Sequence, residues 1–232
     1  MTGRSDVRLR RREQLRAAGV YLVTEEALSG ARTSEEIAMA ALAAGIRIIQ
    51  VRDKEGTARR ALAIALALRA VTRERGALLL VNDRLDLALA AEADGVHLGQ
   101  DDLPVATARA ILGPDVLIGL SITDPEQLEA PDVREADYLG VGAVFPTNSK
   151  SDARYTGLEL LAAARAAVDL PIVAIGGITV ENAAAAVRAG ADVLAVISAI
   201  TAAPDPGSAA RRLLEVVQIT RTTSPTVAGL NP

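Results

Sequence analysis

The amino-acid sequence predicts an α/β fold, a single (β/α)8 barrel (TIM barrel). Eight short apolar runs rich in β-branched residues recur along the 232 residues, and stretches rich in alanine and leucine with helical spacing separate them. Eight such units favour a closed parallel barrel, with an open doubly wound sheet as the alternative. No GxGxxG motif follows the first run, which disfavours the dinucleotide-binding form of that alternative.

The expected strands and helices alternate along the chain. We expect strands at residues 21–24, 46–52, 78–82, 95–98, 116–121, 138–144, 172–175 and 193–197. Capping residues mark several helix starts: Thr33 with Glu36, Thr156 with Glu159, and Asp124 and Asp205, each directly before a proline. Small turns that contain Gly45, Gly95 and Gly190 join helices to the strands that follow them.

Two terminal segments lie outside the eight units. Residues 1–18 form an N-terminal extension, in which residues 6–18 have the pattern of an extra amphipathic helix. The barrel, which is the expected catalytic domain, spans residues 19–217. We expect residues 218–232 to be a mostly polar, flexible and disordered tail.

Composition excludes several kinds of chemistry and partner. The chain has no cysteine and a single histidine, His97, so disulfides, a thiolate nucleophile and multi-histidine zinc sites are excluded. The net charge of −4 and the scarcity of aromatic residues argue against nucleic acid as a partner. No apolar run is long enough to span a membrane and no signal-peptide core follows the arginine-rich start, so the sequence predicts a cytoplasmic protein without a membrane partner.

Cationic side chains follow the second strand, at the end where active sites of such barrels lie. Strand alternation places Gln50, Arg52 and Lys54 on one side and Val51 and Asp53 on the other. Lysine is rare in this chain, since Lys54 and Lys150 are the two lysines among 25 basic residues. Each is therefore a candidate for a compact positive charge in a site, although a solvated loop would show the same residues.

Carboxylates follow the third and fourth strands. Asp83 comes after Asn82, and Asp102 ends the run Gly99-Gln100-Asp101-Asp102. Either aspartate could instead cap the next helix. Beside three cations, however, the two carboxylates would repel a polyphosphate unless a divalent cation lay between them. The set therefore predicts a Mg²⁺–diphosphate site.

The later strands end in residues that suit an anion. The sixth is followed by Phe-Pro-Thr147-Asn148-Ser149-Lys150, and Ser121 ends the fifth. Glycines at 176–177 and small residues at 198–199 allow backbone N–H groups to approach a phosphate. His97 lies within an apolar strand, and we expect it to be a packed, hydrogen-bonded residue rather than a catalytic one.

Seven segments in this order resemble those of thiamine-phosphate synthases. They are Gln50-Val51-Arg52-Asp53-Lys54, Asn82-Asp83-Arg84, residues 94–102, residues 136–142, residues 145–150, residues 174–178 and residues 197–200. The resemblance covers about residues 19–217. Val51, Asp53 and Ser149 depart from the residues most frequent at those positions in the family.

The resemblance implies an activity and a set of roles. The enzyme would join 4-amino-2-methyl-5-(diphosphooxymethyl)pyrimidine to a thiazole phosphate, releasing diphosphate and forming thiamine phosphate. The implied pyrimidine diphosphate site is Gln50, Val51, Arg52, Asp53, Lys54, Asn82, Ser121 and Lys150, with Arg52, Lys54, Lys150 and Ser121 as catalytic residues. Asp83 and Asp102 would bind one Mg²⁺ per active site. The implied thiazole phosphate site is Thr147, Asn148, Ser149, Gly177, Ile197 and Ser198.

Two other functions remain open on sequence grounds. A thiazole tautomerase-like enzyme would share the barrel and phosphate pocket but would not need the aspartates and Lys150. A non-catalytic regulator that binds thiamine phosphate would not need the full set of charges. The sequence also leaves open the oligomeric state, a homo-oligomer included, and whether the thiazole partner carries a carboxylate.

Overall fold

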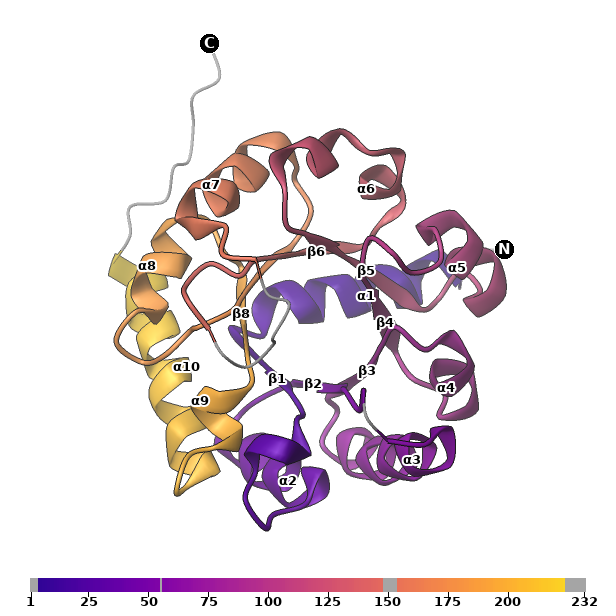
Figure 1. Ribbon diagram of the computed structural model, residues 1–232, viewed down its shortest axis with the longest axis vertical. Coiled ribbons are helices and arrows are strands. Elements are labelled where there is room, and N and C mark those ends of the chain that lie inside the picture. The colour runs from indigo at the N-terminus through magenta and orange to yellow at the C-terminus, as the bar shows by residue number, and fades with distance from the viewer. Residues whose placement is uncertain (1–3, 55, 148–153, 224–232) are drawn as a thin grey trace.

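The computed structural model describes residues 4–54, 56–147 and 154–223, which contain a closed barrel of eight parallel strands. The strands are β1 (Val20–Val23), β2 (Ile48–Val51), β3 (Leu78–Asn82), β4 (Gly95–Leu98), β5 (Leu117–Ile122), β6 (Tyr138–Val141), β7 (Ile172–Ile175) and β8 (Val193–Val196). They pair in sequence order, and β1 pairs with β8 to close the ring (Figure 1). The predicted (β/α)8 barrel is confirmed.

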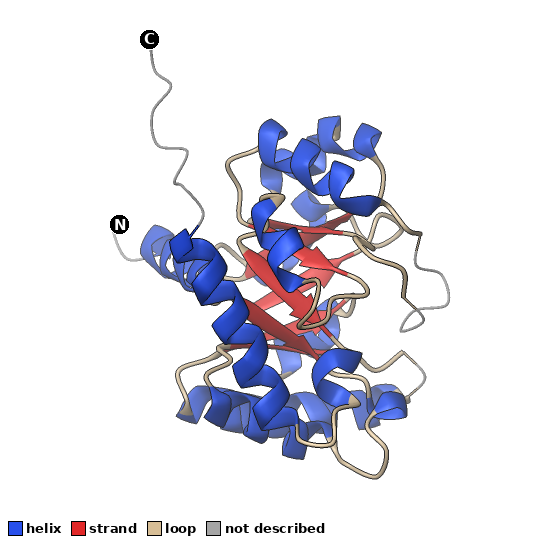
Figure 2. Cartoon of the chain, turned by 90° about the vertical axis from the view of Figure 1, so that its left-hand side faces the viewer, coloured by secondary structure: helices blue, strands red, loops and turns tan. Residues whose placement is uncertain are grey.

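Helices surround the strands (Figure 2). They are α1 (Arg4–Ala17), α2 (Ser34–Ala44), α3 (Ala58–Glu74), α4 (Leu85–Ala90), α5 (Val105–Leu112), α6 (Pro131–Glu135), α7 (Gly157–Ala167), α8 (Ala183–Arg188), α9 (Ser198–Thr201) and α10 (Pro206–Thr223), with short 3-10 helices η1 (Glu26–Leu28) and η2 (Pro125–Glu129). In the described part of the chain, no helix is long and apolar enough to cross a membrane.

Side-chain alternation along the strands divides the apolar residues into two cores. One lies between strands and helices, and the other fills the barrel interior. Glycines inside the barrel make room for large neighbours. A Cβ at Gly119 would lie 2.1 Å from Cζ of Tyr138, and a Cβ at Gly140 would lie 2.6 Å from Cε1 of His97. The interior is therefore filled from β6 and β4, while β5 and β6 contribute the space.

Helix α1 covers the end of the barrel at which the strands begin. Leu15 is fully buried and belongs to the interior core with Tyr21 and Ile48. Figure 1 shows α1 crossing behind the ring of strands. The extra N-terminal helix is thus confirmed, and it closes one end of the barrel.

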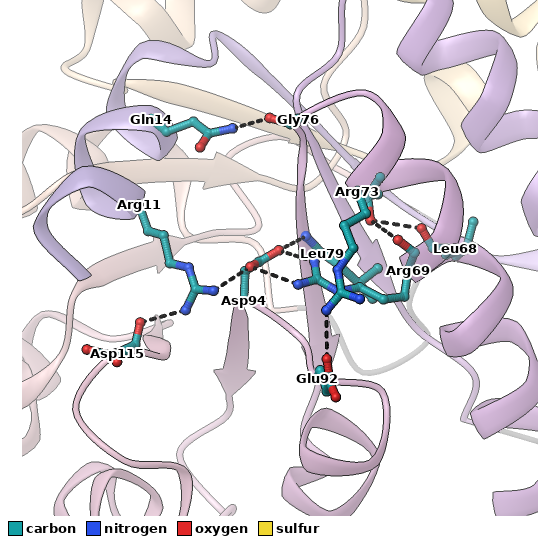
Figure 3. Close-up of polar contacts among 11 residues, drawn as sticks. Arg11, Gln14, Leu68, Arg69, Arg73, Gly76, Leu79, Glu92, Asp94 and Asp115 are labelled. Atoms are coloured by element: carbon teal, nitrogen blue, oxygen red, sulfur yellow. Dashed lines mark hydrogen bonds and ion pairs between the residues drawn. The ribbon is translucent and has the colours of Figure 1, made fainter. Parts of the chain in front are cut away.

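Buried aspartates join strands and helices at the same end. Asp94, directly before β4, accepts a hydrogen bond from the Leu79 N–H and pairs with Arg69 of α3 at 2.6 Å and with Arg11 of α1 at 2.7 Å (Figure 3). Buried charges need partners, and here strand, helix and extension all supply them. This arrangement ties α1 to the barrel.

Two expectations about helix ends are wrong. Helix α10 continues to Thr223, so residues 218–223 belong to a helix rather than to the expected tail, and residues 224–232 lie outside the described residues. No capping box forms at Thr156, because its hydroxyl donates to the Ala143 carbonyl oxygen at 3.2 Å instead. The boxes at Thr33 and Asp124 are present, and Asp205 accepts from the Ser208 N–H.

Candidate active site

A cavity of about 370 Å³ opens at the ends of the strands opposite α1. Residues that follow successive strands line it, which is where the fold places chemistry. Among them are Lys54, Asp83, Asp102, Ser121, Gly177 and Ser198. A smaller hollow of about 30 Å³ lies next to it, and Asn82, His97 and Ser121 line both. Most of the described residues that the sequence assigns to the site therefore lie around one opening of the barrel.

Strand alternation places Gln50, Arg52 and Lys54 on one side, and the structure divides them between the two hollows. Lys54 is exposed and lines the large cavity, whereas Gln50 and Arg52 line the smaller hollow. Arg52 pairs with Glu25, and 8% of its side chain is exposed. Its Nε is buried and has no hydrogen-bond partner among the residues that the structure describes, so one donor of the guanidinium is available there.

Two residues predicted for the pyrimidine diphosphate site have side chains elsewhere. Val51 is 3% exposed and packs in the core between strands and helices. Asp53 accepts a hydrogen bond from the Gly56 N–H at 2.9 Å and lies 3.6 Å from Arg60. Neither side chain lines the cavity. Val51 serves packing, and Asp53 holds the turn that carries Lys54.

Both candidate metal ligands line the cavity. Asp83 has a left-handed backbone (φ 62°), which asparagine and aspartate adopt more readily than most residues, and its N–H donates to the His97 carbonyl oxygen. Asp102 accepts a hydrogen bond from the Gly99 N–H at 2.6 Å. It does not cap α5, whose N-cap is Pro104. The alternative in which these aspartates are only helix caps is therefore wrong for Asp102.

Residues that follow β6, β7 and β8 line the other part of the cavity. Thr147, Gly177, Ile197 and Ser198 all line it. Gly177 has φ +66°, and a Cβ there would lie 2.4 Å from the Pro146 carbonyl oxygen, so glycine is required. Asn148, Ser149 and Lys150, which the sequence also assigned to the site, lie outside the described residues.

A polar network forms the inner wall. The His97 ring lies between the Tyr138 hydroxyl, 3.1 Å from Nδ1, and Ser121 Oγ, 2.9 Å from Nε2. Gln50 donates to Asn82 Oδ1 at 3.2 Å. Burial raises the pKa of Tyr138 and raises that of Tyr21 well above its ordinary value, so both phenols stay protonated. His97 is packed and hydrogen-bonded, as the sequence predicts.

Four further polar residues line the cavity without having been assigned a role from the sequence. They are Gln100, Asp101, Thr123 and Arg154. Arg154 pairs with Asp124 at 3.0 Å and reaches the cavity because its carbonyl oxygen accepts from the Ala143 N–H, which ties it to the end of β6. Because arginine is common in this chain, the sequence alone does not mark Arg154 as a residue of the cavity.

A barrel with cationic, carboxylate and backbone N–H groups around one opening belongs to the class of (β/α)8-barrel enzymes that act on phosphorylated substrates. The sequence model of one family, described as thiamine monophosphate synthase, matches residues 20–200. The chain belongs to this family, and it is a transferase of thiamine biosynthesis.

Individual relatives agree with the family match. A thiamine-phosphate synthase of Natronomonas pharaonis is 50% identical over 203 residues, which cover 86% of this chain and 95% of that protein. One from Moorella thermoacetica is 50% identical over 199 residues, covering 85% and 95%.

Solved structures agree as well. The thiamine phosphate pyrophosphorylase of Pyrococcus furiosus superposes with a TM-score of 0.81 at 39% identity, covering 89% of this chain and 98% of that one. A 3-hexulose-6-phosphate synthase, at a TM-score of 0.61 and 21% identity over 84% of this chain and 99% of that one, shares the fold.

Proposed function

We propose that the enzyme condenses 4-amino-2-methyl-5-(diphosphooxymethyl)pyrimidine with 4-methyl-5-(2-phosphooxyethyl)thiazole, or its carboxylated form, to give thiamine phosphate and diphosphate. The observation that carries this proposal is the charge arrangement of a single cavity. Lys54, Asp83 and Asp102 line one side of it, and Gly177 and Ser198 line another. Such a cavity suits two phosphorylated substrates side by side.

The carboxylates fit a Mg²⁺ ion. Asp83 and Asp102 supply hard oxygen ligands, and Mg²⁺ is commonly held by one or two carboxylates plus substrate phosphate oxygens. Among the residues described, no group of three or more His, Cys, Asp or Glu side chains could hold a metal ion. In the proposed site, diphosphate and water would supply the remaining ligands of the ion. When bound, the ion would supply positive charge to the departing diphosphate.

The reaction needs charge stabilisation rather than proton transfer. In the proposed order, the C–O bond to diphosphate breaks first and its electron pair leaves with the diphosphate. The resulting pyrimidine cation is stabilised by its amino group, and the thiazole nitrogen then forms the new C–N bond. Lys54 and Arg52 would stabilise the negative charge that develops on the leaving group. Lys150 is assigned the same role by the resemblance.

The second substrate would bind across the cavity. Thr147, Gly177, Ile197 and Ser198 would surround the thiazole phosphate, with Asn148 and Ser149 added by the resemblance. Backbone N–H groups near glycine approach phosphate closely and bind it without extra charge. Holding the thiazole nitrogen close to the pyrimidine methylene would supply much of the rate acceleration.

A two-substrate assay tests the proposal. Purified protein incubated with both substrates and Mg²⁺ should release diphosphate and thiamine phosphate in equal amounts, and neither when one substrate is omitted. Absence of diphosphate release would contradict the proposal. Turnover of thiazole phosphate alone without Mg²⁺ would favour the tautomerase alternative. Tight binding of thiamine phosphate without any turnover would favour the regulator.

A further inference from the structure

A chain of hydrogen-bonding side chains leads from the barrel interior to the cavity. Tyr21, which is 1% exposed, and Tyr138, which is fully buried, belong to the core that fills the barrel interior. The Tyr138 hydroxyl lies 3.1 Å from Nδ1 of His97, and Nε2 of the same ring lies 2.9 Å from Ser121 Oγ. Ser121 lines the large cavity and so forms the open end.

Packing fixes the positions of the His97 and Tyr138 rings. The rings of His97 and Tyr138 stack with centroids 5.5 Å apart and an interplanar angle of 29°. Gly140 and Gly119 lie against them, and a Cβ at either position would collide with His97 or Tyr138, respectively. Each glycine provides room for one ring. Strands β4, β5 and β6 therefore set the distances of His97 from Tyr138 and Ser121.

The number of available protons determines which group donates and which accepts in each of these hydrogen bonds. Each hydroxyl has one proton to donate, and a neutral imidazole has one donor and one acceptor nitrogen. Among the described residues, the hydrogen-bond partner of the fully buried Tyr138 hydroxyl is Nδ1 of His97. Tyr138 must therefore donate to Nδ1, since a buried donor without an acceptor is costly.

The remaining bonds follow from that first one. Nδ1 of His97 accepts this hydrogen bond and therefore carries no proton. The proton of the imidazole is then on Nε2, which donates to Ser121 Oγ. The Ser121 proton is left to point into the cavity.

We propose that His97 is a positioning residue that holds the Ser121 hydroxyl as a hydrogen-bond donor toward the substrate. This deepens the proposed function and rests on it. On an aminopyrimidine the ring nitrogens accept hydrogen bonds and the amino group donates them. A donating Ser121 therefore selects a ring nitrogen and turns the amino group away.

The single histidine makes the tautomer directly measurable. Nitrogen-15 NMR of the labelled protein without substrate should show a protonated Nε2 and an unprotonated Nδ1. Tyr138→Phe should shift the ring toward the Nδ1–H tautomer. The matched variant Tyr21→Phe removes an equally buried hydroxyl and should keep the Nε2–H tautomer. A wild-type ring protonated at Nδ1 alone would overturn the proposal, whether or not the enzyme turns over.

Two substitutions of His97 separate positioning from packing. The amide nitrogen of His97→Gln reaches the position of Nε2 and can donate to Ser121, whereas that of His97→Asn reaches only the position of Nδ1. We expect kcat to fall by about tenfold in His97→Asn, the effect of one lost hydrogen bond, and to recover to within about threefold of wild type in His97→Gln.

The KM for the thiazole phosphate should stay unchanged in both variants, with circular dichroism as the check on folding. Equal losses in both variants, or no loss in either, would contradict the proposal. If one variant does not fold, the wild-type tautomer still decides. Wild-type protein with the expected tautomer but no turnover would refute the proposed function and leave the orientation of Ser121 standing.

Discussion

At the scale of single residues, Lys54 places an exposed ammonium at the cavity. We expect Lys54→Ala to lower kcat/KM by about a hundredfold, because one preorganised donor to a developing charge is typically worth that much. Folding should be unaffected. The matched control is Arg59→Ala, which removes an exposed cation five residues away and should change kcat/KM by less than about twofold. Steady-state kinetics on both variants decide, and equal effects would remove Lys54 from the site.

Asp102 has two tasks that one substitution can separate. Its carboxylate accepts from the Gly99 N–H at 2.6 Å and is also a candidate Mg²⁺ ligand. Asp102→Asn keeps an acceptor oxygen for Gly99 but removes the charge. We expect the Mg²⁺ concentration for half-maximal rate to rise by about tenfold or more while the melting temperature stays close to wild type. An unchanged Mg²⁺ titration would reduce Asp102 to a residue that holds the loop.

Local sequence rules predict site residues where a strand carries them. The period of two correctly separates Gln50 and Arg52 from Val51, because alternation along β2 is fixed by the backbone. Beyond the strand end this rule stops, and Asp53 turns out to hold its own loop. Arg154 reaches the cavity through contacts with the distant Ala143, which no neighbouring residue in the sequence reveals.

At the scale of elements, α1 closes the barrel, and Leu15 is its buried anchor. We expect Leu15→Ala to lower the free energy of unfolding by about 2–5 kcal/mol, since the cavity left under the barrel would be poorly filled. Leu9→Ala is the matched control on the same helix, because Leu9 is 43% exposed and should cost less than about 0.5 kcal/mol. Urea denaturation measures both, and similar losses would show that α1 is not anchored through Leu15.

Element positions were predictable because each βα unit repeats the same physical pattern. The observed strands agree with the expected ones to within a few residues at each end. The errors occur where tertiary contacts override local signals. Thr156 has a suitable neighbour in Glu159, but its hydroxyl bonds to Ala143, and α10 continues past the expected start of the tail.

At the scale of the whole molecule, the described residues show one ion-pair pattern that recurs at every second βα unit. Asp94, Asp137 and Asp192 each precede an even-numbered strand and accept from an N–H of the previous strand. Arginines of the helices α3, α5 and α7 pair with them. Arg47 occupies the corresponding position before β2. These charges hold the end of the barrel opposite the cavity, leaving the loops at the cavity free to carry function.

The interior of the barrel also sets how the whole fold responds to alkali. Burial is the main cause that raises the pKa values of Tyr21 and Tyr138 in the folded protein. A phenol in the unfolded chain has a pKa of about 10. Above that pH the unfolded chain binds fewer protons than the folded one, so stability is fully present below about pH 10 and is lost as the pH rises. Each phenol should contribute about 1.4 kcal/mol of loss per pH unit.

Absorbance at 295 nm and circular dichroism, recorded together on a rise from pH 9 to pH 12, test this expectation. Of the three tyrosines, Tyr155 is 61% exposed, and the two buried phenols should ionise only as the helical signal disappears. Tyr21→Phe should roughly halve the fall in stability per pH unit above about pH 10, because one of the two buried phenols is gone. Ionisation of all three phenols while the circular dichroism is still that of the folded protein would mean that water reaches the barrel interior and the hydrogen bond between Tyr138 and His97.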